Sequence, residues 1–108
     1  MSKKAVYQQE KEKLTEIFAD VEESTRRLVE GLIEDAAFLK AENYVLKENL
    51  TEIGMIIFNP NNRLQQKPVE ASKQYLKNVN SYAVIIKTLN SVLNKNILED
   101  EEELSDYE

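Results

Sequence analysis

The stretch GMIIFNPNNRLQQKP, from Gly54 to Pro68, holds both prolines of the chain and one of its two glycines. The segments on either side consist mostly of helix-forming residues, and Gly31 is their only glycine. Because glycine and proline interrupt helices, the stretch predicts a connector between two long helices. Gly54 occupies the place where a residue with positive φ closes a helix, and Pro68 fits the first position of the next helix.

Apolar residues recur at helical spacing before the connector. They predict a short helix over about residues 8–19, a break near Asp20 where Asp20 and Glu23 fit a capping box, and a long helix from about 21 to 53. One continuous helix would also fit. The main stripe is Phe18, Val21, Thr25, Leu28, Leu32, Ala36, Leu39, Asn43, Leu46, Leu50 and Ile53. A second stripe is Val29, Ile33, Ala37 and Phe38.

The residues after the connector repeat this arrangement over about 69–95. One stripe steps three and four residues without a fault, through Val69, Ser72, Leu76, Val79, Ala83, Ile86, Asn90, Leu93 and Ile97. Beside it runs a second stripe, Ala71, Tyr75, Tyr82, Ile85, Leu89 and Val92. Two long helices with a short connector predict an all-α fold, a long antiparallel helical hairpin. The apolar run Met55 to Phe58 and the turn NPNN predict a short β-like tip.

Each long helix has two apolar stripes, whereas a two-helix hairpin needs one per helix. The alternative is a three-helix bundle in which the N-terminal helix covers the surplus, but that helix looks too short for a hairpin of this length. We therefore expect a ring-shaped homo-oligomer. Its expected contacts are Leu39, Leu46, Tyr75, Tyr82, Ile85, Ile86 and Leu89.

Charge is distributed unevenly, although the net charge is only −6. Residues 1–53 carry an excess of acids and residues 54–97 an excess of bases, which indicates a polyanionic partner. One basic cluster follows the connector, and its members are the candidate phosphate contacts: Arg63, Lys67, Lys73 and Lys77. The alternative contact is a flexible basic arm at the start of the chain, with Lys3, Lys4, Lys11 and Lys13.

The last eleven residues, LEDEEELSDYE, contain seven acids and no base. Mutual repulsion predicts a disordered tail beyond about Leu98. Its spaced apolar residues, Leu98, Leu104 and Tyr107, suit docking onto a basic surface of a partner. The chain thus divides into an arm with a short helix (1–20), a hairpin (21–97, loop 54–67) and an acidic tail (98–108).

Catalysis is not expected. The chain has neither His nor Cys, no glycine-rich phosphate loop and no recognised metal-ligand set, so we expect no enzyme activity, no metal and no cofactor. No apolar run approaches the roughly 20 residues of a membrane span, and the start lacks a signal-peptide core, which favours a cytoplasmic protein.

The segments IFADVEESTRRLVEGLIEDAAFLKAENYVLKENLTEIG and KPVEASKQYLKNVNSYAVIIKTLNSVL resemble the small terminase subunit of tailed bacteriophages. The resemblance spans roughly residues 17–94 and is to the all-helical branch that ends in a "Y…IIK.L…L" helix. It depends on the LIEDAAF block, on Gly54 and on the spacing from Tyr82 to Leu93. It implies a ring in the bacterial host cytoplasm that recognises viral double-stranded DNA. The same resemblance implies recruitment of the large terminase subunit, the ATPase and nuclease.

Two departures from that family bear on DNA recognition. Many small terminases begin with a helix-turn-helix domain, which the first 20 residues are too few to form, and the connector lacks the glycines common in this branch. Two other classes stay open: a prefoldin-like chaperone, and a coiled-coil adaptor without a nucleic-acid role. The size of the assembly separates them, because an adaptor predicts a dimer and a terminase predicts a large ring.

Overall fold

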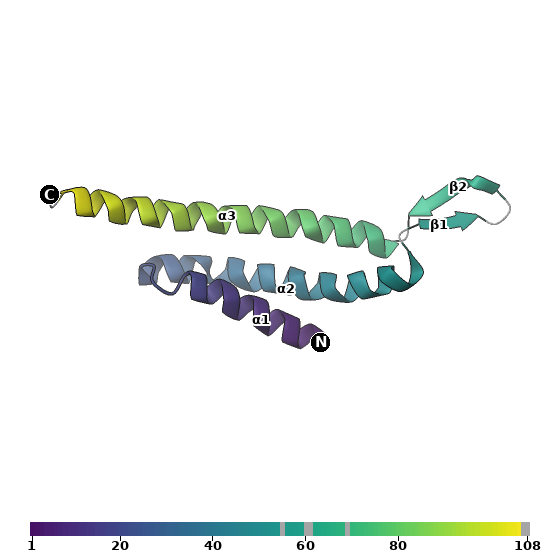
Figure 1. Cartoon of the computed structure of the whole chain (residues 1–108), viewed down its shortest axis with the longest axis horizontal. Coiled ribbons are helices and arrows are strands. Elements are labelled where there is room, and N and C mark those ends of the chain that lie inside the picture. Colours follow the sequence, from purple (N-terminus) through teal and green to yellow (C-terminus); the bar gives the residue numbers. More distant parts are fainter. Residues whose placement is uncertain (55, 60–61, 69, 107–108) are drawn as a thin grey trace.

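A computed structural model describes the backbone of residues 1–54, 56–59, 62–68 and 70–106, and the side chains of residues 1–54 and 70–98. The elements are α1 (Lys3–Ile17), α2 (Glu23–Ile53), β1 (Ile56–Asn59), β2 (Asn62–Pro68) and α3 (Glu70–Asp106). The predicted helical class is confirmed. In Figure 1, α2 and α3 lie side by side and run in opposite directions, and α1 packs along α2. The β1–β2 pair projects at one end, and α3 extends past the other.

The first two helices meet in a tight turn between Ile17 and Glu23, so the break predicted near residue 20 is present. However, α1 begins at Lys3, earlier than predicted, because Ser2 caps it by accepting a hydrogen bond from the Ala5 amide at 3.1 Å. The predicted capping box is wrong, since the N-cap is Glu22 and its side chain makes no capping bond. Burial of the neighbouring side chains Phe18 and Val21 holds the turn instead.

Gly54 ends α2 with φ +79°, as predicted, and its amide donates to the Leu50 carbonyl oxygen at 2.8 Å. Pro68 does not open the next helix. It pairs with Ile56 at the end of the antiparallel β1–β2 ladder, and α3 begins at Glu70. A two-stranded sheet consists of edge strands only, and an edge tolerates the missing N–H of proline.

Helix α3 continues through the acidic segment to Asp106, so the disorder predicted beyond Leu98 is wrong. The reason lies in local propensity. Residues 70–106 contain neither glycine nor proline, and glutamate and leucine are both good helix formers. Repulsion between neighbouring acids on a helix costs only about 0.2–0.5 kcal/mol per pair, which is too little to end it.

The core lies where the three helices meet, around Phe18, Val29, Ile33 and Leu89. Helix α1 has 15 residues and packs over the second stripe of α2, where Val29, Ile33 and Ala37 are buried. The N-terminal helix was expected to be too short to cover a hairpin of this length. It covers this part of α2, whereas Phe38 of the same stripe and Leu76 of α3 stay exposed. In the described part of the chain, no helix is long and apolar enough to cross a membrane.

Candidate functional site

Two cavities lie between α1 and α3, separated by a hydrogen bond that joins these helices. The Tyr82 hydroxyl donates to Glu10 Oε1 at 2.6 Å. Glu10 is only 6% exposed, and its other oxygen pairs with Lys13 Nζ at 3.2 Å. Lys40 Nζ lies 5.5 Å from the centre of the Tyr82 ring, which places a cation over the ring face. We call this arrangement the Tyr82–Glu10 bridge.

The bridge is suited to structural support rather than to proton transfer. Burial raises the pKa of the Tyr82 phenol, and the hydrogen bond to Glu10 and the carboxylate charge raise this pKa further. A phenol with a raised pKa stays protonated at neutral pH and is a poor base or nucleophile. The pair therefore ties α1 to α3 and offers no evident chemistry.

The polar cavity lies on the side of the bridge nearer the start of α1, and its volume is about 340 Å³. Its polar lining residues are Lys40, Asn43, Tyr44, Lys47, Tyr75 and Tyr82. Asn43 Nδ2 donates to the Tyr75 carbonyl oxygen at 3.3 Å, whereas Asn43 Oδ1 is buried without a hydrogen-bond partner within the described residues. Neither lysine makes an ion pair with the described side chains, so both charges are available to a ligand.

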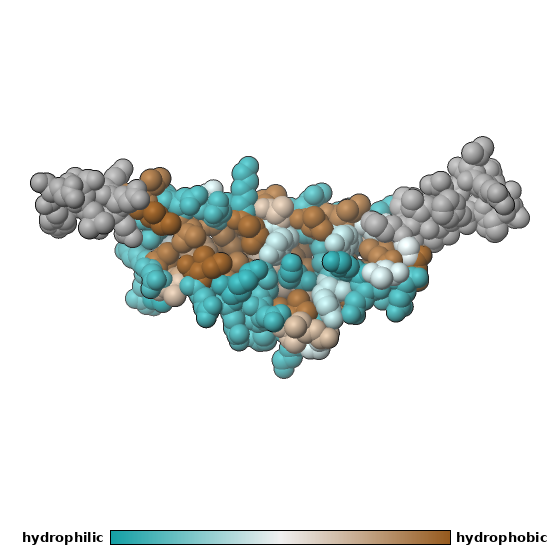
Figure 2. Space-filling view, viewed as in Figure 1, coloured by the Kyte–Doolittle hydropathy of each residue, from teal (hydrophilic) through white to brown (hydrophobic). Residues whose placement is uncertain are grey.

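The apolar cavity lies beyond the bridge, near the end of α1, and its volume is about 170 Å³. Its apolar lining residues are Leu14, Ile17, Phe18, Ile86, Leu89 and Leu93. Asn90 is the one polar side chain among the described residues that line it. Figure 2 shows apolar side chains gathered on the visible face along α3 and between α3 and α1.

A third cavity, of about 330 Å³, opens beside the turn between α1 and α2. Its charged lining residues include acids and bases that neutralise one another, as in the Arg27–Glu23 pair at 3.4 Å. In the part of the chain that the structure describes, no three acidic residues gather as a metal site would require.

Most of the lysines predicted to contact DNA are paired within the chain. Lys3 pairs with Glu42, and the remaining pairs are Lys11–Glu34 at 3.9 Å, Lys13–Glu10 at 3.2 Å and Lys73–Glu70 at 3.1 Å. The flexible basic arm is therefore wrong, because Lys3, Lys4, Lys11 and Lys13 belong to α1. Lys4 and Lys77 make no ion pair with the described residues. The side chains of Arg63 and Lys67 lie outside the described part.

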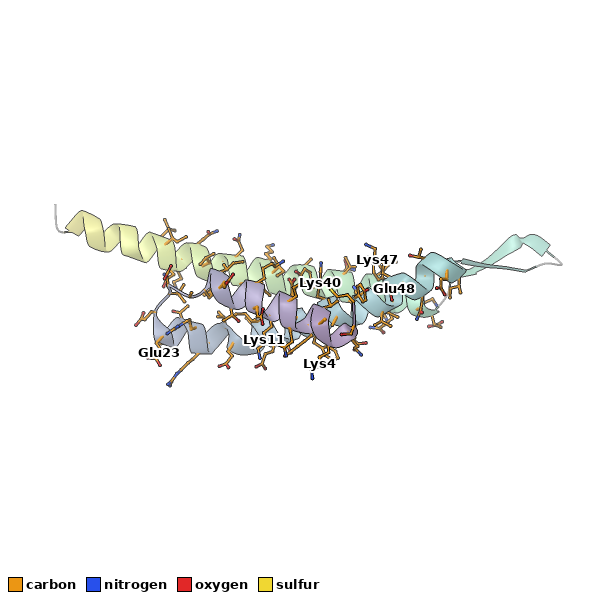
Figure 3. The ribbon with its side chains drawn as sticks, turned by 60° about the horizontal axis from the view of Figure 1, so that its bottom comes forward. Lys4, Lys11, Glu23, Lys40, Lys47 and Glu48 are labelled. Atoms are coloured by element: carbon orange, nitrogen blue, oxygen red, sulfur yellow. The ribbon has the colours of Figure 1, made fainter. Side chains whose placement is uncertain are left out.

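Sequence reasoning missed Lys40 and Lys47. Both belong to α2, and Figure 3 labels them above Lys4 and Lys11 of α1. The sequence contains a pattern that could have identified them. The two lysines are seven residues apart, which is about two helical turns, and Tyr44 lies between them on the same side of the helix. This pattern was not recognised because both lysines lie within residues 1–53, which carry an excess of acids.

The residues predicted to form the oligomer interface pack within the chain. Leu89 is 3% exposed and belongs to the core, and Tyr82, Ile85 and Ile86 pack against that core. The remaining three, Leu39, Leu46 and Tyr75, are half-buried. Helix α3 is turned so that its second stripe faces inward. The exposed apolar residues of α3 belong largely to the first stripe, with Leu76, Val79, Ala83 and Ile97.

The residues predicted for partner docking are only partly described. Leu98 is exposed near the end of α3, Leu104 lies in the helix with its side chain outside the described part, and Tyr107 lies outside it altogether. Comparison of the chain with models of protein families, with curated proteins and with solved structures finds no match.

Proposed function

We propose that the chain is a small terminase subunit, the non-catalytic DNA-recognition and regulatory component of a phage genome-packaging motor. In this proposal α2 and α3 form the helical hairpin, and the hairpins assemble into a ring-shaped homo-oligomer in the host cytoplasm. The ring binds viral double-stranded DNA and recruits the large subunit. The sequence resemblance supplies the family, and the amount of exposed surface supports the assembly.

The exposed surface is the observation that carries the proposal. The chain exposes 8353 Å², whereas a compact protein of this mass exposes about 6,200 Å². Its radius of gyration is 19.6 Å, against about 13 Å for a compact domain of this length. The surplus of about 2,000 Å² is comparable with the roughly 1,600 Å² that two standard interfaces hide on one subunit. A subunit that touches two neighbours in a ring hides surface of this amount.

The DNA contact in this proposal is electrostatic. Lys40 and Lys47 of the polar cavity, together with Lys77 of α3, carry charges that no described acid neutralises. Repeated around a ring, such lysines hold phosphates without reading bases, so affinity falls steeply with salt and depends little on sequence. Arg63 and Lys67 of β2 remain the second candidate contact.

The test measures assembly and DNA binding on the same samples. Native mass spectrometry should give a closed oligomer larger than a dimer, and fluorescence anisotropy should show duplex binding that weakens between 50 and 200 mM salt. Lys40→Glu with Lys47→Glu should abolish binding and leave the mass unchanged. The matched control is Arg26→Glu with Lys95→Glu, two exposed basic residues that line neither the polar nor the apolar cavity, which should have little effect.

Other results would point to a different DNA contact or to a different class of protein. If only Arg63→Glu with Lys67→Glu abolishes binding, DNA contacts β2 and not the polar cavity. A dimer that binds no DNA at any salt concentration contradicts the terminase and favours the coiled-coil adaptor, which the exposed stripe of α3 also fits. Suppression of the aggregation of an unfolded client, without DNA binding, favours the chaperone.

A further inference from the structure

We propose that Phe38 of one copy inserts into the apolar cavity of the next copy, so that copies join face to back. The inference rests on the proposed homo-oligomer and names the contact that builds it. Its occupant is a second copy of this chain, because the same molecule carries both the projecting ring and a cavity that fits it.

The projecting side is the outer face of α2. Phe38 is 56% exposed, and Gly31 and Val45, seven residues before and after it, lie on the same side of the helix. Apart from its chain neighbours and the adjacent helix backbone, no atom lies within 4 Å of a Cβ built on Gly31, so packing against the other elements does not explain a glycine there. A glycine in a helix interior costs about 0.5–1 kcal/mol relative to alanine, and it permits close approach of another backbone.

The apolar cavity that would receive Phe38 lies on the opposite side of α2 from the Phe38 side chain. Val29 is buried where α2 meets the other two helices, and Lys47 lines the polar cavity between them. Phe38 is nine residues from each, which is two and a half helical turns, so it points about 180° away from both. One copy therefore cannot fill its own cavity with Phe38.

The cavity matches the size and chemistry of a phenyl ring. Its volume is about 170 Å³ and its lining is leucine, isoleucine and phenylalanine, apart from Asn90. The apolar cavity is open to solvent on one side, so a ring can enter from outside, and even a fully enclosed cavity of about 150 Å³ with such a lining takes up benzene. The apolar half of the space between α1 and α3 is therefore large enough for Phe38, and entry removes an exposed aromatic ring from water.

Charges around the two sides are complementary. Asp35 lies beside Phe38 on α2, where the neighbouring acids Glu34 and Glu42 already pair with Lys11 and Lys3 of α1. Lys87 of α3 lies next to Ile86, which lines the apolar cavity. Asp35 and Lys87 make no ion pair with the described residues, so both are available across an interface. Such complementarity favours one orientation of the two copies over others.

The geometry also sets the type of assembly. The two surfaces differ and lie on opposite sides, so the contact is heterologous and each copy uses one surface on each neighbour. A heterologous contact produces a ring when the rotation closes. An isologous dimer, in contrast, would use the same face of both copies, so the side of α2 that carries Phe38 would meet its own counterpart.

The first test removes the phenyl group of Phe38. Phe38→Ala should weaken association of the copies by about 30-fold or more, the effect of removing an aromatic hot spot. Because Phe38 is exposed in the single chain, the helical circular dichroism of the dissociated variant should stay unchanged. The matched control is Val84→Ala, which removes an apolar side chain of α3 that is 64% exposed and lines neither cavity. This control should associate as the original chain does.

The second test uses the absence of cysteine in the chain. A variant with both Phe38→Cys and Asn90→Cys should give a ladder of disulfide-linked copies on mild oxidation, whereas each single variant should stay uncrosslinked. Crosslinking of the Phe38→Cys variant alone would show an isologous contact and overturn the proposal. An oligomer that neither loses affinity in Phe38→Ala nor forms the ladder overturns this contact but not the proposed function. A monomeric original chain overturns both.

Discussion

At the scale of single residues, the two glycines predict opposite effects of one substitution. Gly31→Ala adds a Cβ that meets no atom within 4 Å, in a helix interior, so the free energy of unfolding should rise by about 0.5–1 kcal/mol. Gly54 has φ +79° and ψ 170°, a region almost restricted to glycine, so Gly54→Ala should lower this free energy by about 1–3 kcal/mol. Urea unfolding on a Phe38→Ala background measures both without the contribution of association. If both substitutions raise the free energy of unfolding, or both lower it, backbone conformation does not explain the two glycines.

The Tyr82–Glu10 bridge predicts a loss of stability at alkaline pH. The pKa of Tyr82 in the folded chain is raised above its ordinary value of 10.0, first by burial and then by the hydrogen bond to Glu10. A raised folded pKa means that the stabilisation is complete below pH 10 and is lost as pH rises toward the folded pKa. Tyr82→Phe should therefore unfold more easily at neutral pH, because Glu10 loses its donor, and should show a flatter decline above pH 10.

The control for this prediction is Tyr44→Phe. The hydrogen bond to Glu48 raises the pKa of Tyr44 as well, but Tyr44 does not join two helices. Thermal unfolding followed from pH 7 to 11 should show little change in the Tyr44 variant. Equal behaviour of the two variants would mean that the bridge does not hold α1 on α3.

At the scale of elements, the spacing of apolar residues predicts α2 well, but it misses the first residues of α1 and ends α3 about eleven residues early. The buried side of α1 contains Val6, Glu10 and Leu14 at intervals of four, and the central residue is an acid. The periodic spacing of apolar residues is therefore interrupted at Glu10. Its burial makes sense only with Tyr82, 72 residues away, and no local pattern reveals that partner.

The candidate site was harder to predict than the elements. Steps of three and four identify two stripes on α3 but do not say which one faces inward. Because α1 supplies a third helix, the stripe containing Leu89 packs inside the chain, whereas the stripe containing Leu76 stays largely exposed. The cavities between α1 and α3 depend on the angle at which the two helices pack, which local sequence does not encode.

The packing of α1 gives the prediction at this scale. Phe18→Ala should lower the free energy of unfolding by about 3–5 kcal/mol, because Phe18 is 3% exposed at the point where α1 meets the core. The adjacent Ile17→Ala should cost much less, since Ile17 is 49% exposed. Urea unfolding at concentrations where the copies are dissociated measures both. Similar losses would mean that burial in the turn does not hold α1 in place.

At the scale of the whole molecule, the two ends of an elongated chain are electrically different. The principal extents are 75 × 28 × 17 Å, with β1 and β2 at one end and the end of α3 at the other (Figure 1). The basic residues Arg63 and Lys67 belong to the first end, and the acidic residues between 98 and 106 to the second. Glu99 follows Glu70 by 29 residues of α3, which separates the two groups by about 44 Å, about five Debye lengths at physiological salt.

This separation predicts what removal of residues 98–108 does in the proposed terminase. Oligomer mass and DNA affinity should stay nearly unchanged, because the acids begin about 33 Å along α3 from Lys77 and farther still from the β1–β2 end, too far to screen either DNA contact, while binding to the large subunit should weaken. A full-length variant with Glu101→Gln, Glu102→Gln and Glu103→Gln separates charge from length and should reproduce much of that loss if the acids dock onto a basic surface. Native mass spectrometry, anisotropy and pull-down with the large subunit measure the three properties. Tighter DNA binding after truncation, with unchanged affinity for the large subunit, would place the acids on the DNA side of the assembly and contradict the docking role.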